Sequence, residues 1–108
     1  MMTTIRYFED GGCCYLHVGG HADYSPGGMD IVCSAVSMLA CTLAACLEDE
    51  ERRGNLKRLD ISLNEGDACL EWEPEDFAAG RLRTIWETVE TGFSLLAEHY
   101  PANVEWEE

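Results

Sequence analysis

Basic side chains are scarce in this sequence. Only 7 lysine and arginine residues stand against 21 aspartate and glutamate residues in a chain of 108, which gives a formal net charge of −14. Such a surface repels nucleic-acid phosphates, because nucleic-acid binding depends on basic side chains. We therefore expect no direct nucleic-acid contact. The charge is compatible with a basic polypeptide substrate, which such a surface would attract over a Debye length of about 8–10 Å.

Long apolar runs and export signals are also missing. The longest apolar candidate, residues 31–47, is interrupted by Ser34, Ser37 and Thr42 and falls short of the roughly 18 residues of a membrane span. Residues 1–6 show no basic segment followed by the apolar stretch of a secretory signal. These absences predict a protein that stays in the cytoplasm and does not enter a membrane.

Cysteine is plentiful, but the spacings that usually give it a structural role are absent. The chain has six cysteines without a C-x-x-C or H-E-x-x-H pattern, which disfavours a metal site or a dithiol redox motif. Adjacent Cys13 and Cys14 are poorly placed for a mutual disulfide, and Cys41 and Cys46 would not share a helix face. We expect six reduced thiols and no cofactor.

Alternation of polar and apolar residues predicts two β-hairpins, each followed by a helix. The expected strands cover residues 3–8, 14–18, 58–64 and 68–73, with room for a further short strand at 104–107. The first helix is expected over 31–53, before a glycine, and the second between Pro74 and Pro101. This order predicts an α+β fold of two ββα units, with the helices on one face of a mainly antiparallel sheet. We expect residues 1–108 to form a single domain.

The first predicted helix carries an apolar stripe that should lie against the sheet. The stripe consists of Ile31, Val32, Ala35, Val36, Leu39, Ala40, Leu43, Ala44 and Leu47. Acidic residues at 48–51 then crowd the end of the helix, where they oppose its dipole. No sequence pattern accounts for these acids.

Cys33 is the residue best placed for covalent chemistry. If Asp30 caps the helix, Cys33 is its third residue, where the helix dipole favours the nucleophilic thiolate. His21 follows a strand and two glycines and precedes the loop that leads to this helix. A Cys–His pair suffices for acyl transfer, because the imidazole removes the thiol proton and later protonates the leaving amine. Taken singly, a buried Cys33 and a surface His21 are the simpler interpretations.

Two further side chains have alternative roles. Asp30 is either the helix cap alone or, in addition, an orienting group for His21; we favour capping with a secondary electrostatic role. Ser37 lies one turn after Cys33 on the same helix face. Its hydroxyl donates a hydrogen bond near the sulfur or the substrate, or else binds the preceding turn of the helix.

The run from Gly20 to Ser37 resembles the ribosomal-processing cysteine protease family, Prp, of Firmicutes and their relatives. The similarity lies in Gly20-His21-Ala22, Gly28, Asp30-Ile31-Val32-Cys33 and Ala35-Val36-Ser37. It implies a homodimeric α+β cysteine endopeptidase that removes an N-terminal extension from a large-subunit ribosomal protein. The substrate partner would then be the precursor of that protein, cut after an aromatic residue.

The resemblance also implies roles for individual residues. His21 and Cys33 match the catalytic pair, and Asp30 and Ser37 match accessory positions of the active site. Ala22, Gly27 and Gly28 match a mobile loop beside the substrate. Asp23 and Ser34 depart from the family pattern, which bears on the substrate groove more than on the chemistry.

Three other functions stay open at this point. A non-catalytic acidic module could bind a basic ribosomal segment, although it would not explain a cysteine at a helix N-terminus. A redox thiol protein lacks a C-x-x-C partner for Cys33. A zinc site could draw on Cys13, Cys14, His17, His21 and Cys33.

Overall fold

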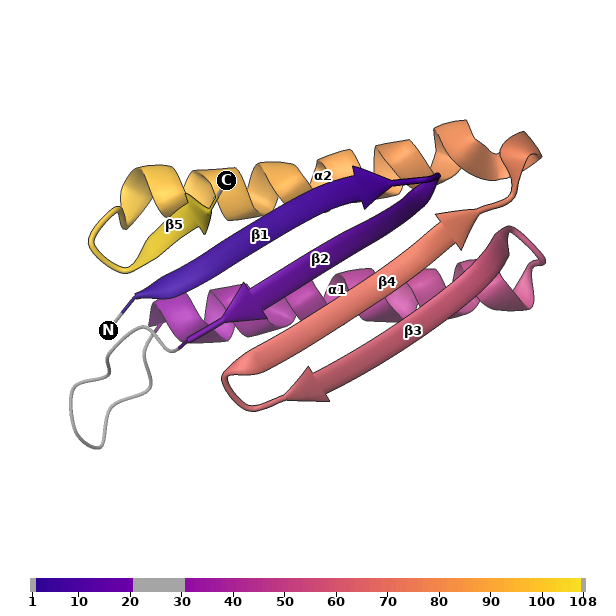
Figure 1. Ribbon diagram of the computed structural model, residues 1–108. Helices are drawn as coiled ribbons and strands as arrows, with labels where there is room; N and C mark the ends of the chain where they lie inside the picture. The colour runs from indigo at the N-terminus through magenta and orange to yellow at the C-terminus, as the bar shows by residue number, and fades with distance from the viewer. Residues whose placement is uncertain (1, 21–30, 108) are drawn as a thin grey trace.

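The computed structural model describes residues 2–20 and 31–107, which form one sheet backed by two long helices (Figure 1). The elements are β1 (Thr3–Asp10), β2 (Cys13–Gly19), α1 (Ile31–Arg52), β3 (Leu56–Asn64), β4 (Asp67–Pro74), a short 3₁₀ turn η1 (Asp76–Ala78), α2 (Ala79–His99) and β5 (Val104–Glu107). The predicted order of two ββα units and a final strand is confirmed.

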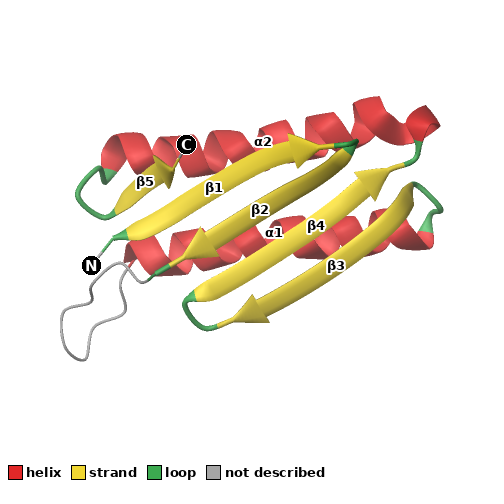
Figure 2. Cartoon of the chain, viewed as in Figure 1, coloured by secondary structure: helices red, strands yellow, loops and turns green. Residues whose placement is uncertain are grey.

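The sheet has five strands in the order β3-β4-β2-β1-β5. Every neighbouring pair is antiparallel except β1 and β5, which run parallel. Both helices cover one face, and the opposite face has no covering helix among the described residues (Figure 2). The predicted α+β architecture is therefore confirmed, and it leaves one face of the sheet open.

The core lies between the sheet and the two helices. Its largest fully buried side chains include Ile5, Leu16, Leu43, Leu47, Leu70, Trp72, Leu82 and Phe93. Burial of each large apolar side chain contributes about 1.5–3 kcal/mol. Tyr7 stacks on Trp86 at 4.2 Å between ring centroids and so links the sheet to α2.

One residue of the predicted apolar stripe is misplaced. Ile31, the first residue of α1, is 75% exposed, whereas Val32 and Val36 are buried. Successive residues can both be buried in the middle of α1, as Leu43 and Ala44 are, but Ile31 is the first residue of the helix and lies at its terminus. The expectation that Ile31 packs in the core is wrong for this reason.

Helix α1 is long and apolar enough, by length and composition alone, to cross a membrane. In the structure Leu43 and Leu47 are fully buried in the core, and Val36 is nearly so. This is the behaviour of a helix that packs against a sheet in a globular domain.

Glu50 explains part of the acidic run at the end of α1. Its side chain is only 1% exposed and accepts two hydrogen bonds from the Arg81 guanidinium, at 2.6 and 3.0 Å, and one from Asn55 at 3.0 Å. The hydrogen bonds from Arg81 lower the pKa of Glu50. This carboxylate therefore joins the end of α1 to the start of α2.

Candidate active site

Cys33 lies in the first turn of α1, as predicted, and Ser37 follows one turn later. Both line a cavity of about 280 Å³. The other lining residues are Thr3, Val18, Gly20, Val36, Ala40, Asn64, Glu65, Gly66, Asp67 and Ala68. The cavity thus joins the start of α1, the end of β2 and the turn between β3 and β4.

Gly20 fixes the point at which the chain leaves β2. Its amide donates a hydrogen bond to the carbonyl oxygen of Gly66 at 3.0 Å. Its φ of +83° favours glycine, and a Cβ built there would lie 2.5 Å from the carbonyl oxygen of Met2. The residue before His21 is therefore held at the wall of the cavity that contains Cys33.

Several predicted site residues lie outside the described part of the chain. They are His21, Ala22, Gly27, Gly28 and Asp30. The structure brings Cys33 and Ser37 together at one cavity, and the pairing of His21 with Cys33 stays a prediction.

Ser37 is exposed at the cavity rather than buried in the helix packing. Exposure leaves both roles of Ser37 open, because the exposed hydroxyls of Thr84, Thr88 and Thr91 in α2 also donate to the carbonyl oxygen four residues before. Whether the Ser37 hydroxyl contacts the substrate or the preceding turn stays a prediction.

The cavity wall is acidic. Glu65 and Asp67 are among its lining residues, although the Asp67 carboxylate is hydrogen-bonded to His17 on the open face of the sheet, and no lysine or arginine is among the described lining residues. A peptide with basic residues would therefore meet favourable potential here.

Thr3 and the turn at 64–66 contribute to the cavity in a way that the sequence does not indicate. The sequence predicts a turn at Glu65-Gly66, but the position of this turn beside Gly20 depends on the pairing of β2 with β4. That pairing joins segments that lie far apart in the chain, and no local pattern encodes it. Thr3 is buried at the cavity, and its amide donates a hydrogen bond to the carbonyl oxygen of Asn103 at 2.8 Å.

The described cysteines and histidine of the zinc alternative are not brought together. Cys14 packs against the core, and burial raises its pKa, whereas His17 is an exposed residue of β2. Among the described residues, the one cluster with suitable ligand spacing is His17, Asp67 and Cys69. The six cysteines all lie in the described part of the chain, and none of them forms a disulfide.

Comparison with known proteins identifies the class of this chain as a cysteine protease. A family model described as cysteine protease Prp matches residues 1–105. The chain belongs to the cysteine protease Prp family. No curated protein matches it.

Solved structures show the same fold. The essential ribosomal processing protease Prp from S. aureus, in complex with a covalently linked product peptide, has a TM-score of 0.71 at 21% identity, with 98% of each chain covered. The structure of the S. aureus protease with a substrate peptide has a TM-score of 0.68 at 20% identity, again with 98% of each chain covered. The structure of SMU.848 from Streptococcus mutans has a TM-score of 0.67 at 22% identity, and the match covers 98% of this chain and 92% of that one.

Proposed function

We propose that this protein is a single-domain cysteine endopeptidase that removes the N-terminal extension of a large-subunit ribosomal protein, with Cys33 as nucleophile and His21 as general base. The family membership supports the protease activity, and the S. aureus relative is a ribosomal processing protease. The observation that carries the assignment is the cavity shared by Cys33 and Gly20. His21 directly follows Gly20 in the sequence, which supports its assignment as the general base for Cys33.

The proposed reaction follows from these assignments. His21 removes the proton from Cys33 Sγ, and the thiolate attacks the carbonyl carbon of the scissile peptide bond. The positive end of the α1 dipole stabilises the thiolate and the negative oxygen of the tetrahedral intermediate. Collapse of the intermediate breaks the C–N bond, and the His21 imidazolium protonates the leaving amine. Water, deprotonated by His21, then hydrolyses the thioester.

The remaining predicted site residues have supporting roles in this proposal. Asp30 caps α1 and adds an electrostatic contribution to the orientation of His21. Ser37 offers its hydroxyl to the bound peptide one turn beyond the nucleophile. Ala22, Gly27 and Gly28 belong to the segment that contacts substrate.

We further propose that the protein acts in the cytoplasm as a homodimer. An apolar groove of about 400 Å³ runs along α1 and α2 and includes Leu39 and Gly92. Met38 and Leu95, 65% and 52% exposed, lie in this groove, and a second copy of the chain would cover them. Light scattering coupled to size-exclusion chromatography tests this: a Met38→Glu variant should shift the dimer toward monomer, whereas a monomeric parent protein would contradict the proposal.

Incubation with the ribosomal protein precursor of the same organism tests the activity. Intact-mass measurement should show loss of the N-terminal extension with the parent protein and with Cys41→Ala, a matched control for another cysteine of α1. Cys33→Ala and His21→Ala should leave the precursor uncut. Cleavage by Cys33→Ala would refute the nucleophile. Tight binding of the precursor by the parent protein without any cleavage would support the acidic binding module instead.

A further inference from the structure

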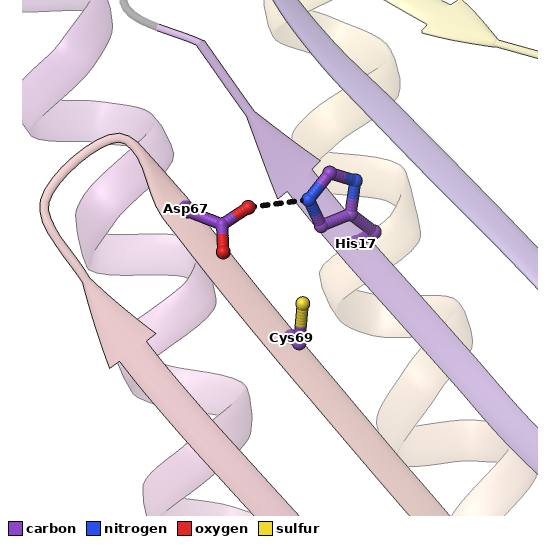
Figure 3. Close-up of side chains that lie close together, drawn as sticks. All are labelled: His17, Asp67 and Cys69. Atoms are coloured by element: carbon purple, nitrogen blue, oxygen red, sulfur yellow. Dashed lines mark hydrogen bonds and ion pairs between the residues drawn. The ribbon is translucent and has the colours of Figure 1, made fainter.

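Three potential metal ligands meet on the open face of the sheet (Figure 3). His17 comes from β2, and Asp67 and Cys69 come from β4. One ligand atom from each lies within 4.8 Å of the other two. His17 Nε2 is already 2.6 Å from Asp67 Oδ1.

The sheet itself sets this arrangement. His17 is the direct cross-strand partner of Cys69, and Asp67 lies two residues before Cys69 on the same face of β4. Side chains of direct partners are about 4.5–5.5 Å apart at Cβ, and the diagonal neighbour is within reach of a long side chain. The three groups are therefore held by the strand ladder rather than by a loop.

Gly19 opens the space for the diagonal contact. It is the cross-strand partner of Asp67, and a Cβ built at Gly19 would lie 2.9 Å from His17 Cε1. The imidazole thus occupies the place that a side chain at this position would take. A larger residue would displace the ring from Asp67, so the absence of a side chain contributes to bringing nitrogen and carboxylate together.

The chemistry of the three donors selects the metal. Calcium and magnesium prefer all-oxygen sites, whereas a thiolate with an imidazole suits zinc. Zinc–ligand bonds of about 2.0–2.3 Å place tetrahedral donors roughly 3.3–3.8 Å apart. The present separations between ligand atoms run from 2.6 Å, between His17 Nε2 and Asp67 Oδ1, to at most 4.8 Å. Small side-chain rotations bring them into that range, since His17 and Asp67 are both exposed.

We propose that His17, Asp67 and Cys69 form a three-ligand site for zinc or a similar borderline-soft divalent cation, with water as the fourth ligand. On binding, the sulfur–hydrogen bond of Cys69 is broken, a sulfur–metal bond forms and the proton passes to solvent. The thiolate and the carboxylate then balance the two positive charges, and no oxidation state changes. The net charge of −14 raises the local concentration of any cation. This site does not depend on the protease assignment.

Cobalt is the probe for the test, because tetrahedral Co²⁺ bound to thiolate absorbs strongly in the visible and has a sulfur-to-metal charge-transfer band. The titration uses the full-length reduced protein carrying Cys33→Ser, so that the thiol at the cavity does not contribute. We expect one equivalent to bind with that band, and Zn²⁺ but not Mg²⁺ to displace it. Cys69→Ser should abolish the band, and His17→Asn should weaken binding by more than the roughly 10–100-fold typical of an outer-sphere partner. Cys41→Ser is the matched control and should bind cobalt as the parent does.

A second measurement needs no ligand substitution and covers the case in which a variant fails to fold. Zn²⁺ should protect Cys69 from iodoacetamide in the native protein without protecting Cys41, as read by mass mapping of partially alkylated protein. A spectrum without the charge-transfer band, a band that persists in Cys69→Ser, or equal alkylation of Cys69 with and without Zn²⁺ would each overturn the proposal.

Discussion

Cys33 differs from the other cysteines by its place in the first turn of α1. The helix dipole favours a thiolate there, and thiolate reacts with iodoacetamide whereas thiol does not. Near neutral pH we expect Cys33 to be alkylated faster than Cys41, which is exposed in the middle of the same helix. Mass mapping after brief alkylation measures both rates in one sample. Faster labelling of Cys41, despite its lack of a helix terminus, would contradict the assignment of the nucleophile.

The backbone conformation of Gly20 predicts that a side chain at this position lowers the free energy of unfolding. Gly20→Ala combines a positive φ with a contact of 2.5 Å to Met2, and we expect a loss of about 1–3 kcal/mol in the free energy of unfolding. Gly54→Ala is the matched control, because Gly54 has a φ of +80° but no atom within 4 Å of the place that an added Cβ would take. Urea denaturation should show the smaller loss for Gly54→Ala. Equal losses would mean that the contact with Met2 does not hold the end of β2.

The candidate site could be read from the sequence only in part. Cys33 and Ser37 are predictable because helix position and spacing are local properties. Their neighbours Thr3 and Gly66 are not, because they reach the cavity through sheet pairing between distant segments. The cluster of metal ligands could not be predicted from the sequence for the same reason. His17 and Asp67 are 50 positions apart in the chain, and they come together only through the register of β2 on β4.

At the scale of elements, each hairpin and helix is more predictable from the sequence than the contacts between them. Alternation and helical periodicity predict all five strands and both long helices, with boundaries off by a few residues. The misplacement of Ile31 arises at a helix terminus, where the apolar stripe begins. No local pattern explains the buried Glu50, because its partner Arg81 is 31 positions away on another helix.

The contact between Glu50 and Arg81 predicts how the junction of α1 and α2 responds to pH. The pKa of Glu50 is lowered in the folded protein, so its stabilisation is complete above the unfolded value of about 4.3 and is lost as pH falls through the lower folded value. Glu50→Gln should therefore reduce the free energy of unfolding at pH 7 by about 1.5–3 kcal/mol, the contribution of charge-assisted hydrogen bonds. Its stability should also fall less steeply than that of the parent below about pH 4.3.

Chemical denaturation over a pH series measures both effects. Arg83→Gln is the control, because the ion pair of Arg83 with Glu9 is exposed and spans 4.0 Å. Such pairs contribute about 0–1 kcal/mol. If Glu50→Gln and the parent lose stability in parallel as pH falls, another carboxylate governs the acid response.

At the scale of the whole molecule, the net charge of −14 predicts salt-dependent capture of a basic substrate. Long-range attraction raises the association rate and is screened by salt, whereas the proposed proton transfer between Cys33 and His21 would act at short range. Raising the ionic strength from roughly 0.05 M to 0.5 M should lower kcat/KM, chiefly through KM, and leave kcat nearly unchanged.

A short neutral peptide spanning the cleavage site is the control for this effect. It should show little salt dependence under the same conditions. An equal response of the neutral peptide and the full-length precursor would show that the acidic surface serves solubility alone.

The parallel pairing of β1 with β5 has a consequence for how the protein is made. Thr3 pairs with Val104 and Ile5 with Trp106, so the outer edge of β1 gains its partner only after about 100 further residues have been synthesised. At roughly 5–20 residues per second, a ribosome needs about 5–20 s to supply them. During that time the nascent chain has β1 and β2 available but lacks Val104 in the core and Trp106 against Phe93. The sheet is therefore completed only after residues 104–107 leave the exit tunnel, and full protease activity should appear after translation of this segment rather than during it.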